Sequence, residues 1–249
     1  MLFLLDPGYL LLIVVTLVIS GAAQLYVSSA YKKWSQVRNS VNMTGAQVGK
    51  AIVDRTPLGD AAYAPASIQA MGGSVVNGST ITFQRVGGQL TDHYDPRTHA
   101  VSLSDGVATQ PSVAAMAIVA HELGHAQQHE QASVLMTLRN FLVPAVQISP
   151  QVAYLMIFLG FILQIVDLIY LGVIFYAVMV LFTLVTLPVE IDASRRGLTL
   201  LRDAGLMDSE QDATGSRQVL TAAAMTYLAA AVTAVLTLLY YLSLANRRR

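Results

Sequence analysis

A long apolar run from Phe141 to Val189 constrains the fold more than any other feature of the chain. Few polar residues interrupt it, among them Gln147, Ser149, Gln164 and Asp167. A membrane-spanning helix needs about 20 apolar residues, so the run is too long for one span and suits two. We expect a turn at Gln164 to Asp167, although Asp167 could instead be a functional acid inside the membrane.

Two further apolar runs could cross a bilayer. The first lies within residues 8–30 and the last within 219–244, which predicts about four transmembrane helices in all. A cleaved signal peptide is the alternative for the first run, but basic residues follow it rather than precede it: Lys32, Lys33 and Arg38. This charge pattern predicts a permanent anchor with residue 31 onward in the cytosol.

The composition supports a membrane protein. Hydrophobic residues make up 54% of the 249 residues and charged residues only 12%. The formal net charge is zero, so no overall field favours nucleic acid as a partner. The chain has no cysteine, which excludes disulfides, a thiolate zinc site and a cysteine nucleophile.

The chain is expected to divide into five parts. They are a transmembrane anchor (1–30), a water-facing α+β region (31–140), a transmembrane hairpin (141–189), a charged cytosolic helix (190–218), and a last transmembrane helix with a basic tail (219–249). By this count the basic tail lies outside, against the positive-inside rule. Either the basic residues on the other side outweigh it, or the last helix does not cross.

The water-facing region mixes helix and strand signals. Thr44 to Arg55 predicts a helix with Thr44 as N-cap. Asn77-Gly78 predicts a hairpin turn between two short strands. Gln89 to Tyr94 and His99 to Ser104 are expected to form two more strands. The result would be a sheet of three or four strands beside the helix described next.

An HExxH motif lies in a small and aliphatic segment that follows a possible N-cap, Ser112. His121 and His125 are four residues apart, so on a helix they lie on one face and can bind the same zinc ion. Glu122 can then take a proton from a zinc-activated water without being a ligand. The motif also occurs by chance in unrelated helices, but buried histidines and a glutamate are costly unless paired or metal-bound.

A catalytic zinc needs a third protein ligand and one open position. Glu190 is the best candidate, because it lies where the long apolar run ends and a charged helix begins. The alternative is that Glu190 pairs with Arg195 or Arg196.

Three blocks of the sequence resemble the YugP-like family of bacterial membrane zinc metallopeptidases. They are Leu90 to Arg97, His121 to His125, and Leu187 to Arg196. The resemblance implies a gluzincin-type peptidase with His121, His125 and Glu190 as zinc ligands and Glu122 as general base. In the integral-membrane gluzincins an aspartate four residues after the ligand glutamate orients a histidine. Here Ser194 stands in that place and the nearest acid is Asp192.

Three other histidines and one tyrosine could contribute to the site or have only structural roles. His93 or Tyr94 could donate a hydrogen bond to the oxyanion, or the segment could only form the turn at Pro96. His99 is expected to be a surface histidine, and His129 part of a solvated helix end.

The sequence therefore predicts an α-helical membrane protein with a small α+β zincin-like metallopeptidase domain. We expect an endopeptidase with one Zn²⁺ per chain that acts on protein or peptide substrates in or near the bilayer. Its expected location is the inner (plasma) membrane, multi-pass, with the active site on the cytosolic side and a possible protein partner or oligomer. The alternative is a membrane assembly or scaffold factor with a structural or degenerate metal site.

Overall fold

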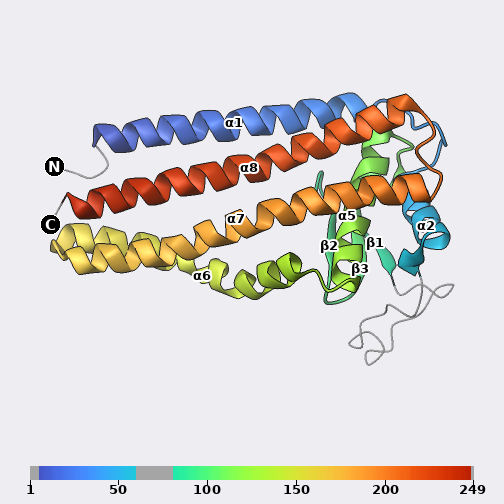
Figure 1. The fold of residues 1–249 in the computed structure, drawn as a ribbon. Helices are drawn as coiled ribbons and strands as arrows, with labels where there is room; N and C mark the ends of the chain where they lie inside the picture. The colour runs from blue at the N-terminus through green and yellow to red at the C-terminus, as the bar shows by residue number, and fades with distance from the viewer. Residues whose placement is uncertain (1–5, 60–80, 248–249) are drawn as a thin grey trace. The chain divides into compact units, whose positions relative to one another are not determined.

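The structure is a computed structural model and describes residues 6–59 and 81–247. Its elements, in chain order, are α1 (Pro7–Ser35), α2 (Gly45–Arg55), η2 (Pro57–Gly59), β1 (Thr82–Val86), β2 (His93–Asp95), β3 (Ala100–Ser104), α4 (Asp105–Thr109), α5 (Val113–Glu130), α6 (Val134–Leu163), α7 (Val166–Asp203) and α8 (Glu210–Asn246). Figure 1 shows how the long helices α1, α6, α7 and α8 dominate the chain. The expected hairpin at Asn77-Gly78 lies outside the described residues.

Among the described residues, four helices are long and apolar enough to cross a membrane: α1, α6, α7 and α8. The expected four spans are therefore confirmed. α6 ends at Leu163 and α7 begins at Val166, with Gln164 in a left-handed conformation (φ 58°), so the turn lies where the sequence predicted it. Asp167 lies in the first turn of α7, as the simpler reading expects.

The chain separates into two compact units. The first contains Met1–Leu25, Thr137–Val189 and Met225–Arg249, and the second contains Tyr26–Met136 and Glu190–Ala224. The apolar part of α7 ends at Val189, and the rest of that helix belongs to the second unit. The first unit is thus the apolar helical part of the protein.

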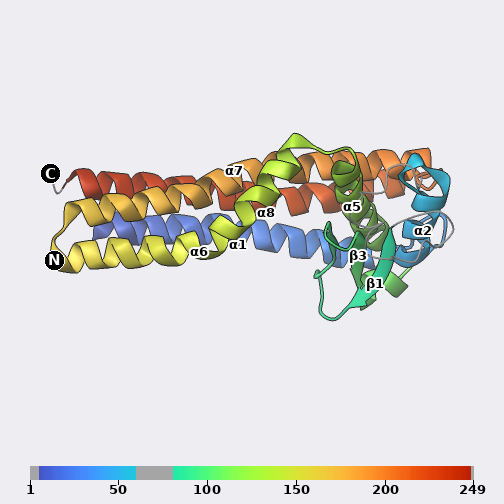
Figure 2. The same ribbon diagram turned by 90° about the horizontal axis from the view of Figure 1, so that it is seen from below.

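Within the first unit, α6 and α7 pack closely. A Cβ on Gly160 would lie 2.6 Å from Ile169 Cγ1, and one on Gly172 would lie 2.8 Å from the Ala153 carbonyl oxygen. Small residues allow such close helix contacts in membranes. Figure 2 shows that α6 changes direction part-way along its length, and the helix contains Pro144 and Pro150, which remove hydrogen bonds from its ladder.

The second unit contains a three-stranded sheet in the order β1-β3-β2. β1 runs parallel to β3 and β2 antiparallel to it, with His93 opposite Ser102. Every residue of the central strand β3 is buried, whereas the two edge strands are partly exposed. Both ribbon views show α5 beside this sheet (Figures 1 and 2). The expected sheet of three or four strands beside the motif helix is confirmed, with three strands among the described residues.

The strand expected at Gln89 to Tyr94 is shorter than predicted, since β2 begins only at His93. Leu90 has a left-handed backbone (φ 57°), which a strand cannot contain. Asp92 accepts hydrogen bonds from the Ser104 amide and hydroxyl instead, at 2.7 and 3.0 Å. These contacts attach the segment before β2 to the end of β3.

Two predicted helix starts are confirmed. Thr44 caps α2, and its side chain and that of Gln47 form a reciprocal capping box. Ser112 caps α5 by accepting from the Ala115 amide at 3.1 Å. Most of α5 is buried, and Val119, Ala120 and Leu123 belong to the core that it shares with α2 and the sheet. The motif helix is therefore the central element of the second unit.

Candidate metal centre

Two helices of the second unit bring three ligand side chains together. His121 and His125 project from α5 and Glu190 from α7, and one ligand atom of each lies within 4.8 Å of the others. The Nε2 atoms of His121 and His125 lie 3.2 and 3.5 Å from Glu190 Oε2. Ligands held about 2.0–2.1 Å from a tetrahedral zinc lie about 3.3 Å apart. The two distances to Glu190 match this value, and the three side chains form a candidate site for one zinc ion.

The two helices approach so closely because two positions lack a side chain. A Cβ on Gly124 would lie 2.2 Å from the Ala193 carbonyl oxygen, and one on Gly197 would lie 2.6 Å from that of Ala120. A real Cβ atom at either place would force the helices apart. Gly124 lies inside the HExxH motif, so the motif makes the close helix contact as well as carrying the two histidines.

Hydrogen bonds orient both ligand histidines. His121 Nδ1 lies 3.2 Å from Ser194 Oγ, and His125 Nδ1 lies 3.0 Å from Gln128 Oε1. An amide oxygen can only accept, so His125 Nδ1 carries a proton and donates it to Gln128. Nε2, which faces Glu190, is therefore the nitrogen of this ring available to a metal.

The Glu190 carboxylate is ionised in this setting. Its side chain is only 2% exposed, and burial by itself raises a carboxyl pKa. Hydrogen bonds and charge from His121 and His125 outweigh burial and hold the pKa of Glu190 well below its usual value. The group is therefore ready to bind a cation.

The structure brings Glu190 to the two histidines and Arg196 to Asp192. Glu190 Oε2 lies 3.2 and 3.5 Å from His121 and His125, and Arg196 Nε donates to Asp192 Oδ2 at 2.6 Å. Arg196 thus forms its salt bridge with Asp192, two residues after Glu190.

Glu122 follows His121 in α5, and its side chain is buried in the second unit. His93 is exposed on β2, and its Nδ1 lies 2.8 Å from the Thr91 carbonyl oxygen. The Tyr94 hydroxyl lies 2.5 Å from His99 Nδ1 and 2.7 Å from His129 Nδ1. The assignment of His93 and Tyr94 to the oxyanion stays a prediction.

The expectations for His99 and His129 were wrong. His99 is completely buried, with its Nε2 3.3 Å from Glu130 Oε1, and His129 is half-buried against Tyr94. The local sequence of each is polar, and only the pairing of β2 with β3 and the packing of α5 bring the rings together. No local sequence pattern predicts a contact between residues so far apart in the chain. The available hint is that His129 follows His125 by four residues, the same spacing as within the HExxH motif.

Burial shifts the pKa values of three side chains in this cluster, those of Tyr94, His129 and Glu130. It raises the pKa of the Tyr94 phenol far above its usual range, with the charges of Glu130 and Asp95 adding to the effect. It lowers the pKa of His129, helped by His99. It raises the pKa of Glu130, although the contact with His99 opposes this. The Tyr94 hydroxyl thus keeps its proton and links two imidazoles.

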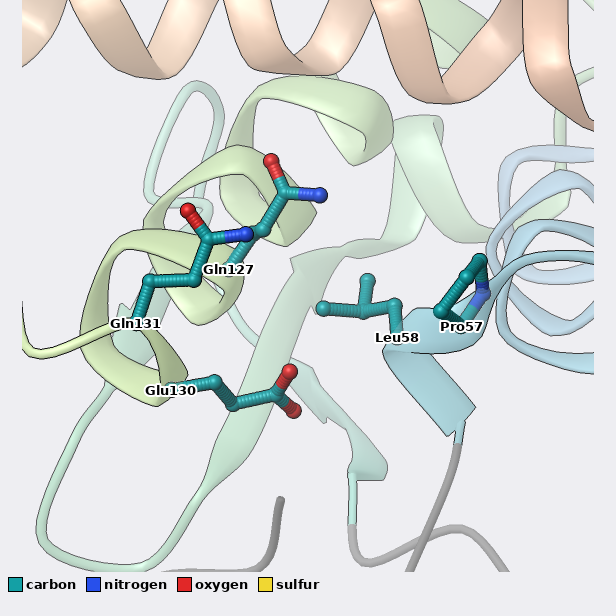
Figure 3. A pocket seen from close by; sticks show the side chains of 5 residues that line it. All are labelled: Pro57, Leu58, Gln127, Glu130 and Gln131. Atoms are coloured by element: carbon teal, nitrogen blue, oxygen red, sulfur yellow. The ribbon is translucent and has the colours of Figure 1, made fainter. Parts of the chain in front are cut away.

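A cavity of about 230 Å³ lies at the C-terminal end of α5. Its lining residues are Pro57, Leu58, Gln127, Glu130 and Gln131. Figure 3 shows the Glu130 carboxylate pointing into the space in front of Leu58. None of these residues belongs to the His121, His125 and Glu190 set, so the cavity is separate from the metal ligands.

The comparison with known proteins agrees with this donor set. Residues 9–71 and 76–246 match the family described as "Putative neutral zinc metallopeptidase". The chain belongs to this family. It is also 34% identical over 233 residues to the "Putative membrane protease YugP" of Bacillus subtilis (strain 168), covering 94% of each chain. No solved structure matches the chain.

Membership of the zinc metallopeptidase family agrees with the chemistry of the site. Two imidazoles and one carboxylate form a common ligand set for catalytic zinc. The match spans the apolar helices as well as the second unit, so the family resemblance covers nearly the whole chain.

Proposed function

We propose that this chain is an integral-membrane zinc-dependent endopeptidase that hydrolyses peptide bonds of membrane or membrane-proximal proteins. The observation that carries the proposal is the meeting of His121, His125 and Glu190, with Glu190 Oε2 3.2 and 3.5 Å from the two histidine nitrogens and one ligand atom of each residue within 4.8 Å of the others. Family membership and the four apolar helices support it.

The proposed roles follow from the donor set. His121, His125 and Glu190 would hold one zinc ion and leave a fourth position open. A zinc ion held there would polarise the scissile carbonyl and would lower the pKa of a water molecule to about 7. Glu122 takes the proton from the attacking water and passes it to the leaving amine. In a closed structural site a fourth protein ligand would be expected, and Glu122 would have no role.

The substrate backbone is proposed to bind along β2. This strand pairs with β3 on one side only, so in the described sheet its other edge is available to an extended peptide. Such main-chain pairing tolerates many substrate sequences. His93, exposed on β2, or Tyr94 is proposed as the oxyanion donor, and the Tyr94→Phe variant distinguishes the two.

The proposed location is the plasma membrane with the active site in the cytosol, supported by Lys32, Lys33 and Arg38 after the first span. Because the chain lacks cysteine, a single introduced cysteine is its only thiol. In intact cells a membrane-impermeant maleimide should label Gln164→Cys but not Lys50→Cys; both positions are exposed. Labelling of Lys50→Cys alone would place the active site outside.

The central experiment compares the purified full chain with Glu122→Gln and His121→Ala. The unaltered chain should hold about one zinc and cleave an unstructured protein substrate. Glu122→Gln should keep zinc and lose cleavage, whereas His121→Ala should lose zinc. Full cleavage by Glu122→Gln would refute the role of Glu122, whereas an unaltered chain that holds zinc but cleaves nothing would favour the scaffold alternative. If the proposal holds, Glu122→Gln can serve as a trap to recover substrates from the membrane.

A further inference from the structure

The Gln128 side chain lies between a ligand histidine and a carboxylate. Its Oε1 accepts from His125 Nδ1 at 3.0 Å, and its Nε2 donates to Asp192 Oδ2 at 2.7 Å. Gln128 is only 1% exposed. Because a carboxylate can only accept, the Asp192 contact fixes which end of the amide faces His125.

Asp192 is held in place from its other side. Arg196 Nε donates to Asp192 Oδ2 at 2.6 Å, and the same guanidinium donates to Gln127 and Gln131 of α5 at 3.2 and 2.6 Å. The carboxylate therefore has a fixed position relative to α5. A chain of contacts runs from Arg196 through Asp192 and Gln128 to His125.

We propose that Gln128 and Asp192 are positioning residues for His125, an inference that rests on the proposed zinc peptidase function. The Asp192 carboxylate polarises the Gln128 amide, and the amide oxygen holds the proton on His125 Nδ1 and directs Nε2 to the metal. Zinc-binding histidines usually donate their second nitrogen to a carboxylate or carbonyl. Here an amide stands between histidine and carboxylate.

This arrangement explains the departure noted in the sequence. Four residues after the ligand glutamate stands Ser194 rather than an acid, and its hydroxyl faces His121 Nδ1 at 3.2 Å. The acid lies at Asp192 and acts on the other ligand, His125, through Gln128. Each ligand histidine thus has its own partner.

Packing alone does not account for Gln128. A leucine would fill a similar volume, and a buried amide costs free energy unless its donors and acceptors are satisfied. Both ends of the Gln128 amide are bonded to groups at the metal centre. The position therefore selects an amide for its hydrogen bonds.

The test measures metal affinity as well as cleavage. Zinc affinity of the full chain in detergent is measured by competition with a chelator, and the geometry of the site by the absorption spectrum of the Co²⁺ form. Gln128→Leu should bind zinc about 10- to 100-fold more weakly and change the Co²⁺ spectrum. Asp192→Asn should weaken binding less, and adding it to Gln128→Leu should cause no further loss, since both act through one path.

An exchange variant separates positioning from general damage. Combining Gln128→Glu with Asp192→Asn swaps the amide and the carboxylate and again presents an oxygen acceptor to His125. It should recover most of the zinc affinity and the Co²⁺ spectrum that Gln128→Leu loses. It also carries the test if Gln128→Leu fails to fold.

Gln131→Leu is the matched control, because it removes the contact of Arg196 with the C-cap of α5, while Arg196 keeps its contacts with Asp192 and Gln127. It should leave zinc affinity unchanged. Three results would overturn the inference: unchanged affinity in Gln128→Leu, an equal loss in Gln131→Leu, or no recovery in the exchange variant. An unaltered chain without zinc would refute the proposed function as well, so the two failures are distinguishable.

Discussion

Replacing Tyr94 by phenylalanine distinguishes a structural tyrosine from a catalytic one. The hydroxyl is shared by His99 Nδ1 and His129 Nδ1, and it joins β2 and the residue before β3 to the end of α5. Tyr94→Phe removes both hydrogen bonds and leaves a fully buried imidazole nitrogen without this partner. Each bond contributes about 1 kcal/mol, and an unsatisfied buried group costs about 1 to 3 kcal/mol. The free energy of unfolding should fall by about 2 to 4 kcal/mol.

The single tryptophan provides the assay. Trp34 is 6% exposed and lies in the second unit, so its fluorescence reports the unfolding of the part that contains Tyr94. The midpoint of denaturant unfolding in detergent should move to lower denaturant for Tyr94→Phe. Tyr26→Phe is the control, because Tyr26 is 46% exposed in the same unit, and it should change stability by less than about 0.5 kcal/mol.

The opposite result would refute this reasoning. If Tyr94→Phe unfolds at the same denaturant concentration and keeps its zinc, while turnover falls about a hundredfold, the hydroxyl donates to the oxyanion. If stability falls and the remaining folded protein turns over normally, the donor is to be sought at His93.

Three further predictions concern pH, packing and metal. Folding holds the pKa of His129 below its unfolded value of about 6.5, so the free energy of unfolding that depends on neutral His129 is present above that pH and is lost as pH falls through the lowered pKa. His129→Gln should therefore lose less stability than the unaltered chain between about pH 7 and about pH 5. Equal losses in the two proteins would contradict this. Gly124→Ala should separate α5 from Ala193 at a cost of about 1 to 3 kcal/mol and reduce zinc content, whereas Gly21→Ala, with nothing within 4 Å, should retain full zinc content. Removing zinc with a chelator should lower the unfolding midpoint, and adding zinc at about a hundred times its dissociation constant should restore about 2.7 kcal/mol; an unchanged midpoint would show that the ion does not bind the folded site.

Local features of the fold could be predicted from the sequence. The caps at Thr44 and Ser112, the four apolar helices and the turn at Gln164 all depend on residues close together in the chain. Period and capping are set within one or two turns of a helix, so they are visible before any tertiary contact is known.

The lengths of the helices were less predictable. The sequence suggested that a new charged helix begins near Glu190, but α7 continues through Pro188 to Asp203, and α8 begins at Glu210, before its apolar part. A change from apolar to charged residues marks a change of surroundings, and a helix can continue across it because its backbone hydrogen bonds are internal.

The HExxH motif predicted the two candidate ligands on α5, since their spacing is a property of one helix. Which carboxylate joins them, and what holds each imidazole, depends on the approach of α5 and α7 at Gly124 and Gly197. Ser194 reaches His121, and Asp192 reaches Gln128, across more than sixty residues of chain. The sequence by itself therefore determined the chemistry available, and the tertiary structure decided the partners, because hydrogen bonds depend on atoms brought within about 3 Å by packing and not on distance along the chain.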